Sequence, residues 1–390
     1  MQRINITLFI PFCLVLLAAI PLQVMAVVGE LDYTLGRSLQ LETELAVDRG
    51  AEFLVEDQLE NGSWNDHPAI TSLATLALAN LPDNSRVQAE VAIKKALDYL
   101  KQQVQEDGGL WNRKTENYKL YSTAVGVMAL VRCNRSEDLA VIGKVRNYLV
   151  NSQQKEPEGE GRKVLNGGFA AGPGGEPNLT VTQWVVEALY LLDSLQLPEN
   201  LRSSAFRTKQ EVPRYRQAVE FIERCQVSTE KNHTTDNNSY GCFRDKPVDD
   251  ERENSDPKVQ DSRTPRAKIF LTCLGLKSLR YAGYRMDDVR IQGALDCLRK
   301  RYTVKENPGL GEAGYYTYLH ALVNALKSLD LPFLEVDGER RFWRPETARE
   351  LLNRQRGDGS WRHDEPAWWE NNPSLSTSYA VLILEKVLLP

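Results

Sequence analysis

A histidine within an apolar stretch is the residue of this chain best suited to acid–base chemistry. His320 lies in GYYTYLHALVNAL, residues 314–326. Imidazole changes charge near neutral pH, so a histidine beside a carboxylate can act as a general acid or base. We expect Asp261 or Asp66 to be that carboxylate, at the mouth of a cavity. The alternatives are a hydrogen-bonded core histidine and a surface ion pair between Asp261 and Arg263.

Aromatic and polar residues recur where the apolar segments begin. An aromatic-lined cavity with a few polar groups is typical of a small-molecule pocket, and ring faces can stabilise a cation. The residues expected to line such a pocket are His67, Tyr118, Tyr121, Gln183, Arg263, Tyr316, Tyr318 and Tyr379. The alternative is that the tyrosines pack in the core with satisfied hydroxyls and that His67 only caps its helix.

Metal, cofactor and nucleic-acid sites are not indicated. The chain has only four histidines and no CxxC or HExxH pair, so we expect no metal. We also expect no cofactor, because the glycine-rich residues 167–178 match no phosphate-binding motif. With a net charge of -5, the chain lacks the basic excess that a phosphate backbone requires. Asp249 and Asp250 are interpreted as part of a solvated acidic loop.

The first 26 residues have the pattern of a signal peptide. Arg3 precedes an apolar run over residues 4–20, and residues 24–26 end in a small residue. We expect an exported protein, secreted or periplasmic, with a membrane anchor as the alternative. Export permits disulfides, and Cys225 and Cys242 flank one loop and could pair. The other cysteines, Cys133, Cys273 and Cys297, are expected to be buried thiols.

The elements that would position these residues form an internal repeat. Residues 49–64, RGAEFLVEDQLENGSW, combine an amphipathic helix with a glutamine and a Gly-x-aromatic turn, and five later units resemble them. The glutamines and the turn residues of the repeat are Gln58, Gln153, Gln226, Gln355, Gly62, Gly359, Trp64, Trp111 and Trp361. We expect each glutamine to donate to the last carbonyls of its own helix and each aromatic side chain to cover that amide.

A second, more apolar helical stretch follows each unit. These stretches are expected over residues 69–81, 120–133, 179–192, 267–279, 316–329 and 375–388. Helices that are apolar all round are buried, and amphipathic ones cover them. No sustained alternation predicts a strand. The sequence therefore predicts an all-α (α/α)6 toroid over residues 27–390, with an open superhelix as the alternative. The longer outer-to-inner connections, 154–178, 227–264 and 303–315, place functional loops on one rim.

The repeat resembles the QW motif of terpene cyclases such as squalene-hopene cyclase. The residues that fit it are Arg49, Gly50, Phe53, Leu54, Gln58, Gly62 and Trp64, and residues 351–361 fit nearly as well. Protein prenyltransferase β subunits share the toroid, and the chain resembles secreted bacterial proteins with prenyltransferase/squalene oxidase repeats. The resemblance implies an isoprenoid-like or lipid ligand inside the barrel.

The catalytic motifs of those families are not reproduced. The chain has no DxDD acid, and Asp296 and Cys297 are adjacent, whereas the prenyltransferase zinc ligands are one residue apart. Three hypotheses remain: an enzyme or binder of an apolar isoprenoid-like molecule, a non-catalytic lipid- or protein-binding scaffold, and a carbohydrate-active toroid. The last requires two carboxylates facing one cavity, whereas Glu187 and Glu385 lie toward the far helix ends. The enzyme hypothesis predicts an apolar cavity with His320 beside a carboxylate.

Overall fold

The computed structural model describes most of the chain after the first 34 residues. The described ranges are 35–155, 163–172, 174–195, 211–227, 239–247, 268–364 and 366–389. The predicted signal peptide, Asp261, Arg263, Asp249 and Asp250 lie outside them. Within these ranges, none of the helices combines the length and the apolar character that crossing a membrane requires.

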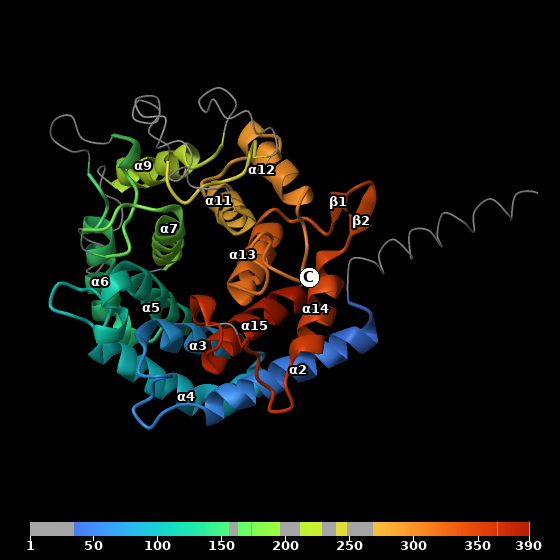
Figure 1. The fold of residues 1–390 in the computed structure, drawn as a ribbon. Helices are drawn as coiled ribbons and strands as arrows, with labels where there is room; N and C mark the ends of the chain where they lie inside the picture. The colour runs from blue at the N-terminus through green and yellow to red at the C-terminus, as the bar shows by residue number, and fades with distance from the viewer. Residues whose placement is uncertain are drawn as a thin grey trace, which may run out of the picture.

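Twelve helices in this described part form two concentric rings (Figure 1). The inner ring consists of α3 (Pro68–Asn80), α5 (Lys119–Cys133), α7 (Leu179–Ser194), α11 (Ile269–Tyr281), α13 (Tyr315–Ser328) and α15 (Pro373–Leu388). The outer ring consists of α2 (Arg37–Glu56), α4 (Asp83–Gln102), α6 (Leu139–Asn151), α9 (Glu211–Arg224), α12 (Val289–Arg299) and α14 (Trp343–Arg354). The predicted (α/α)6 toroid is confirmed.

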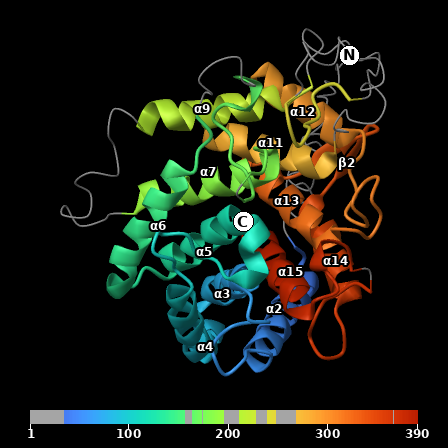
Figure 2. The same cartoon turned by 60° about the vertical axis from the view of Figure 1, so that its left-hand side comes forward.

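The ring is closed by contact between the last helix pair and the first. Figures 1 and 2 both show α14 and α15 beside α2. The Gln355 side-chain amide donates to the carbonyl of Ala46, at 2.9 Å. A Cβ at Gly50 would lie 2.8 Å from the ring of Trp361, so only glycine permits this approach. The molecule is therefore a closed toroid and not an open superhelix.

The inner helices tolerate burial because their polar side chains bond to their own backbone. Ser72 and Thr75 donate their hydroxyls to carbonyls four residues earlier in α3, each at 2.7 Å. Satisfying buried hydroxyls in this way avoids a cost of about 1–3 kcal/mol each. The small side chains of α3 also allow its neighbours in the ring to pack closely.

The repeated glutamine joins neighbouring units, which corrects the predicted capping role. Gln58 Nε2 donates to the carbonyl of Gly62 at 2.9 Å and to that of Ala92, in the following outer helix, at 2.8 Å. Gln226 bonds Gly241 and Arg290 in the same way. The amide does not reach the end of its own helix, because the turn carries the chain against the next outer helix.

The repeated tryptophan caps the helix instead. Trp64 is fully buried, and its Nε1 donates to the carbonyl of Leu54 at 2.8 Å. Trp361 makes the same bond to Leu351 at 2.8 Å. Both carbonyls belong to the last turn of an outer helix, where intrahelical donors run out, although that of Leu351 also accepts from the backbone nitrogen of Gln355. Trp111 departs from this pattern, since its Nε1 has no partner in the described part of the chain.

A short hairpin and the disulfide differ from the sequence-based predictions. The strands β1 (Leu334–Val336) and β2 (Glu339–Arg341) pair antiparallel, and three residues each are too few to show alternation. Cys242 bonds Cys297, with Cα atoms 5.3 Å apart, and not Cys225, which is a buried free thiol. The expected Cys225–Cys242 pair is wrong, as is the free Cys297. The cause is again the turn, which lays Cys242 on the next outer helix, α12.

Candidate functional site

A cavity of about 320 Å³ opens at the rim where the inner helices begin; we refer to it as the upper cavity. It is lined by His67, Ala69, Ile70, Leu73, Tyr118, Tyr121, Thr180, Val181, Trp184, Phe270, Thr317, Trp368, Trp369, Leu375 and Tyr379. All six inner helices contribute to this wall, which is almost entirely aromatic or aliphatic. Such a volume and lining are those of a small-molecule site.

His67 is held as a neutral imidazole at this wall. Its Nδ1 accepts from the Ile70 backbone and caps α3, so the proton lies on Nε2. Nε2 is 2.8 Å from the Tyr118 hydroxyl, which in turn donates to the Lys114 carbonyl. Burial, and then the charge of Lys114, lower the pKa of His67 to about 4. At neutral pH this histidine is a structural hydrogen-bonding group and not an acid.

Two adjacent tryptophans cover part of the mouth. Trp368 and Trp369 have φ angles of 60° and 64°, which few non-glycine residues adopt. Their side chains are 39% and 48% exposed, although they are the largest apolar groups on this rim. Trp369 meets the ring of His67 edge-on at 5.0 Å, and Trp368 meets Phe270 at 5.1 Å. The strained backbone therefore places both indoles over the cavity.

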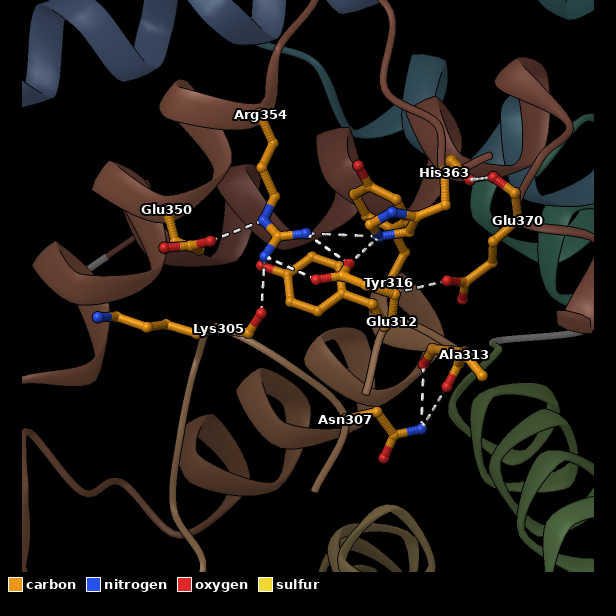
Figure 3. Close-up of polar contacts among 12 residues, drawn as sticks. Lys305, Asn307, Glu312, Ala313, Tyr316, Glu350, Arg354, His363 and Glu370 are labelled. Carbon is orange, nitrogen blue, oxygen red and sulfur yellow. Dashed lines mark hydrogen bonds and ion pairs between the residues drawn. The ribbon is translucent and has the colours of Figure 1, made fainter. Parts of the chain in front are cut away.

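Glu370 fastens this tryptophan segment to the start of α13. Its carboxylate accepts from the backbone nitrogen of Tyr316 at 3.1 Å (Figure 3). It also accepts from the backbone nitrogen and the hydroxyl of Thr317, at 2.8 and 2.7 Å. A helix N-terminus favours a negative charge, which opposes the effect of burial. Burial is the larger effect and raises the pKa of Glu370 to about 7.

The hydroxyl of Thr317 connects this carboxyl to the cavity. Thr317, which bonds Glu370, lines the upper cavity. The Tyr379 hydroxyl, which belongs to the same lining, lies 3.3 Å from that of Tyr121. Burial raises the pKa of Tyr379 well above its ordinary value, so its hydroxyl keeps its proton. Glu370 is thus one threonine hydroxyl away from the cavity wall.

A charged cluster braces the outside of the same rim. Arg354 bonds Glu350 at 2.6 Å, Glu312 at 2.8 Å and the Lys305 carbonyl at 2.6 Å (Figure 3). His363 Nε2 lies 2.9 Å from the Glu312 carboxylate, and burial lowers the pKa of His363. These bonds hold the loop before α13 against α14, so the cluster is structural.

Among the described residues, no carboxylate pairs with His320, and the predicted pairing with Asp66 is not formed. The ring of Trp184 forms the floor of the upper cavity, and His320 stacks on it at 6.1 Å. His320 faces a second cavity beyond this floor. Asp66 lies on the outside, where it accepts from the Tyr99 hydroxyl at 3.0 Å. The third predicted catalytic residue, Asp261, is outside the described ranges.

The residues predicted to line the pocket divide into three groups. His67, Tyr118, Tyr121 and Tyr379 line the upper cavity. Gln183 instead bonds Glu187 at 2.8 Å, and the Tyr318 hydroxyl donates to the Thr303 carbonyl at 2.7 Å. Tyr316 packs beside His363, 5.0 Å between ring centroids. Arg263 lies outside the described ranges. In the part of the chain that is described, no group of three His, Cys, Asp or Glu side chains could hold a metal ion.

Sequence reasoning missed several residues of the site. Thr317, Trp184, Trp368, Trp369 and Glu370 were not among the predicted pocket residues. The one signal available for the last three was a pair of tryptophans in a polar segment, AWWENNP, at residues 367–373. Exposed adjacent tryptophans are unusual, and they mark binding surfaces more often than single apolar residues do.

Known proteins support the architecture. Residues 67–212 match the family model of the squalene-hopene cyclase C-terminal domain. The type II terpene cyclase MstE from Scytonema is similar over 89% of this chain and 98% of its own, with a TM-score of 0.52 and 15% identity. No curated protein matches the chain.

Other solved structures are similar to a comparable degree. The alpha-1,6-mannanase of Salegentibacter sp. aligns over 89% of this chain and 100% of its own, with a TM-score of 0.58 and 13% identity. A protein from Actinoplanes aligns over 89% of this chain and 99% of its own, with a TM-score of 0.52 and 16% identity. At such identities the similarity shows the fold alone.

Proposed function

We propose that this squalene-hopene cyclase-like toroid binds a short, apolar, isoprenoid-like molecule in the upper cavity. The observation that carries the proposal is the state of the polar groups in the wall. The hydroxyls of Tyr118, Tyr121 and Tyr379 and the ring nitrogens of His67 already have hydrogen-bond partners. The wall therefore offers a ligand ring faces and aliphatic surface, which favour an apolar ligand.

The size of the cavity limits the ligand. At about 30 Å³ for each non-hydrogen atom, the volume that one water takes in the liquid, 320 Å³ holds about eleven such atoms. That is the size of a ten-carbon isoprenoid alcohol, and a longer chain would extend through the open mouth. The triterpene squalene is far larger than this space.

Related toroids support both the ligand class and one alternative. The MstE cyclase has been solved with its substrate, geranylgeranyl dihydroxybenzoate. A mannanase variant has been solved with alpha-1,6-mannotriose. Most glycosidases use two carboxylates at one site. Among the described residues, no carboxylate lines the upper cavity, which favours the isoprenoid.

The binding test uses the tryptophans of the site. Geraniol is titrated while intrinsic tryptophan fluorescence is followed, and Ala69→Phe fills the cavity from α3. Ala140→Phe, on the exposed face of α6, is the matched control. We expect saturable binding to the wild type and to the control and a loss of at least tenfold in Ala69→Phe. Saturable binding of mannotriose with no binding of geraniol would overturn the proposal.

Glu370 favours a second candidate, an enzyme that transfers a proton within the cavity. A carboxyl with a pKa of about 7 is partly protonated at neutral pH, as a general acid requires. Aromatic walls also stabilise the cation that protonation of an alkene creates. Incubation with geraniol or farnesol and gas chromatography test this role. The expected result is a cyclised product that is lost in Glu370→Gln and retained in Glu335→Gln. Binding of the alcohol without any product would contradict the enzyme role and show that the protein only binds the ligand.

Export remains part of the proposal. The Cys242–Cys297 disulfide supports it, since such bonds persist in oxidising compartments. The signal-like pattern of residues 1–26 supports it as well. The mass of the protein recovered from its native cell tests it, with a mature chain beginning at Val27 as the expected result. A full-length chain in a reducing compartment would contradict it.

A further inference from the structure

A second cavity, of about 490 Å³, lies on the other side of Trp184, toward the ends of the inner helices. We refer to it as the lower cavity. It is lined by Leu73, Leu76, Asn80, Met128, Val131, Arg132, Asn134, Trp184, Glu187, Leu191, Leu195, Tyr281, His320, Asn324, Leu382 and Lys386. Trp184 and Leu73 belong to both linings and separate the two spaces. Unlike the upper cavity, the lower one has several charged groups.

The carboxylate in the lower cavity is already neutralised. Glu187 Oε1 lies 2.6 Å from Lys277 Nζ, and Glu187 Oε2 accepts from Gln183 at 2.8 Å. Both members of the ion pair are buried, Lys277 being 3% exposed. A buried pair that also makes hydrogen bonds is stable and contributes little net charge. Glu187 is therefore paired directly with Lys277 and not with Lys386.

Lys386 is the cation without a partner. In the described part of the chain its ammonium makes no hydrogen bond or ion pair, although the side chain is partly buried and lines the cavity. Burial, followed by the charge of Lys277, lowers the pKa of Lys386. The carboxyls of Glu187 and Glu385 oppose this change with smaller effects, and burial raises the pKa of Glu385 itself well above its ordinary value.

His320 adds a neutral ring to this positive region, and Arg132 adds a second cation. The ring nitrogens of His320 have no hydrogen-bond partner among the described residues, and His320 lines the cavity. After burial, the charges of Lys277 and Lys386 are what hold its pKa well below the usual range, so both ammonium groups act on this ring. Arg132 lies at the opening, where its Nε donates to Asn80.

The helix ends oppose this positive region only weakly. All six inner helices end toward the lower cavity, α11 with Tyr281, and a helix C-terminus carries about half a negative charge. That effect falls off within the last turn, whereas Lys386 presents a full charge to the cavity. The excess charge facing the lower cavity is therefore positive.

We propose that the lower cavity binds a small carboxylate with an apolar body. Lys386 pairs with the carboxylate, and an N–H of the His320 ring donates to it. Leu76, Met128, Val131 and Leu191 form the apolar wall against which the body of the ligand packs. This site lies beyond the floor of the upper cavity and does not depend on the isoprenoid proposal.

The test compares head groups on one chain length. Octanoate, octanol and octylammonium are titrated by calorimetry into Ala69→Phe, in which the upper cavity is filled. Hydrogen bonds to charged groups contribute about 1.5–3 kcal/mol, so octanoate is expected to bind at least tenfold more tightly than octanol. Lys386→Gln removes this preference. Lys94→Gln, a surface lysine of α4 paired with Asp98, keeps it.

Two further readouts keep the proposal open to refutation. Removing an uncompensated, partly buried charge does not weaken the fold, so Lys386→Gln is expected to unfold at the wild-type temperature or above. In the wild type, octanoate is expected to shift the His320 ring signals in a histidine-labelled NMR sample. Four results would each overturn the proposal. They are equal binding of octanol, tighter binding of octylammonium, a preference for octanoate that survives Lys386→Gln, and His320 signals that do not shift.

Discussion

The buried carboxyl of Glu370 makes a quantitative prediction about stability and pH. Its pKa is about 7 in the folded protein, against 4.5 for the ordinary carboxyl. At about 1.36 kcal/mol for each pH unit, this difference corresponds to roughly 3 kcal/mol. Because the folded state binds the proton more tightly, the stabilisation is complete below pH 4.5 and is lost as the pH rises through 7.

The perturbation that isolates this effect is Glu370→Gln. The amide retains an oxygen that can accept from Thr317 but places an NH2 group opposite the backbone nitrogen of Tyr316. We expect this mismatch to lower the free energy of unfolding by about 1 kcal/mol at every pH. Between pH 4.5 and pH 8, the free energy of unfolding of the variant should therefore rise by roughly 3 kcal/mol relative to that of the wild type.

Urea unfolding at several pH values measures this difference directly. The histidines also titrate in this range, but they do so in both proteins, so they cancel when the two free energies of unfolding are subtracted. Glu335→Gln, at an exposed position of β1, serves as the matched control and should show no change with pH. A Glu370→Gln difference that is equally flat would refute the reasoning, since it would mean that Glu370 ionises normally in the fold.

Three further predictions concern the scaffold. Gln58→Ala removes the two hydrogen bonds to Gly62 and Ala92, and urea unfolding should show a loss of about 1–3 kcal/mol; an unchanged midpoint would contradict the joining role. Reduction of the Cys242–Cys297 bond, which spans a sequence separation of 55, should lower the free energy of unfolding by about 4 kcal/mol, measured with and without reductant. His67, with a pKa of about 4, should remain neutral to pH 5 in an NMR titration, and a midpoint near 6.5 would show that the cap on α3 does not form.

The helices and the closed ring could be predicted because the signal is periodic and repeated. Each inner helix is apolar all round, and the turns marked by Gln58 and Trp64 recur at each junction. His67 and Tyr118 could be placed near the mouth because they precede the inner helices, which all begin at one rim. The sequence alone predicts that the glutamine caps the outer helix, whereas the tryptophan caps it and the glutamine bonds the next outer helix. Both assignments satisfy the same sequence pattern.

The side of each helix that faces the cavity could not be predicted with the same reliability. Successive residues of a helix are about 100° apart, so Thr317 faces the upper cavity. The side chains of its neighbours face elsewhere, Tyr316 packing beside His363 and Tyr318 bonding Thr303. His320 lies one turn further along α13 and therefore falls below the ring of Trp184. Glu370 could not be predicted at all, because its position depends on the left-handed backbone of the two tryptophans before it.

The measurement that tests the central claim most directly is a crystal structure of the protein grown with saturating geraniol. The account predicts electron density for the ligand between the ring of Trp184 and the indoles of Trp368 and Trp369, with no hydrogen bond to His67. An upper cavity that remains empty, or geraniol bound only outside it, would contradict the account.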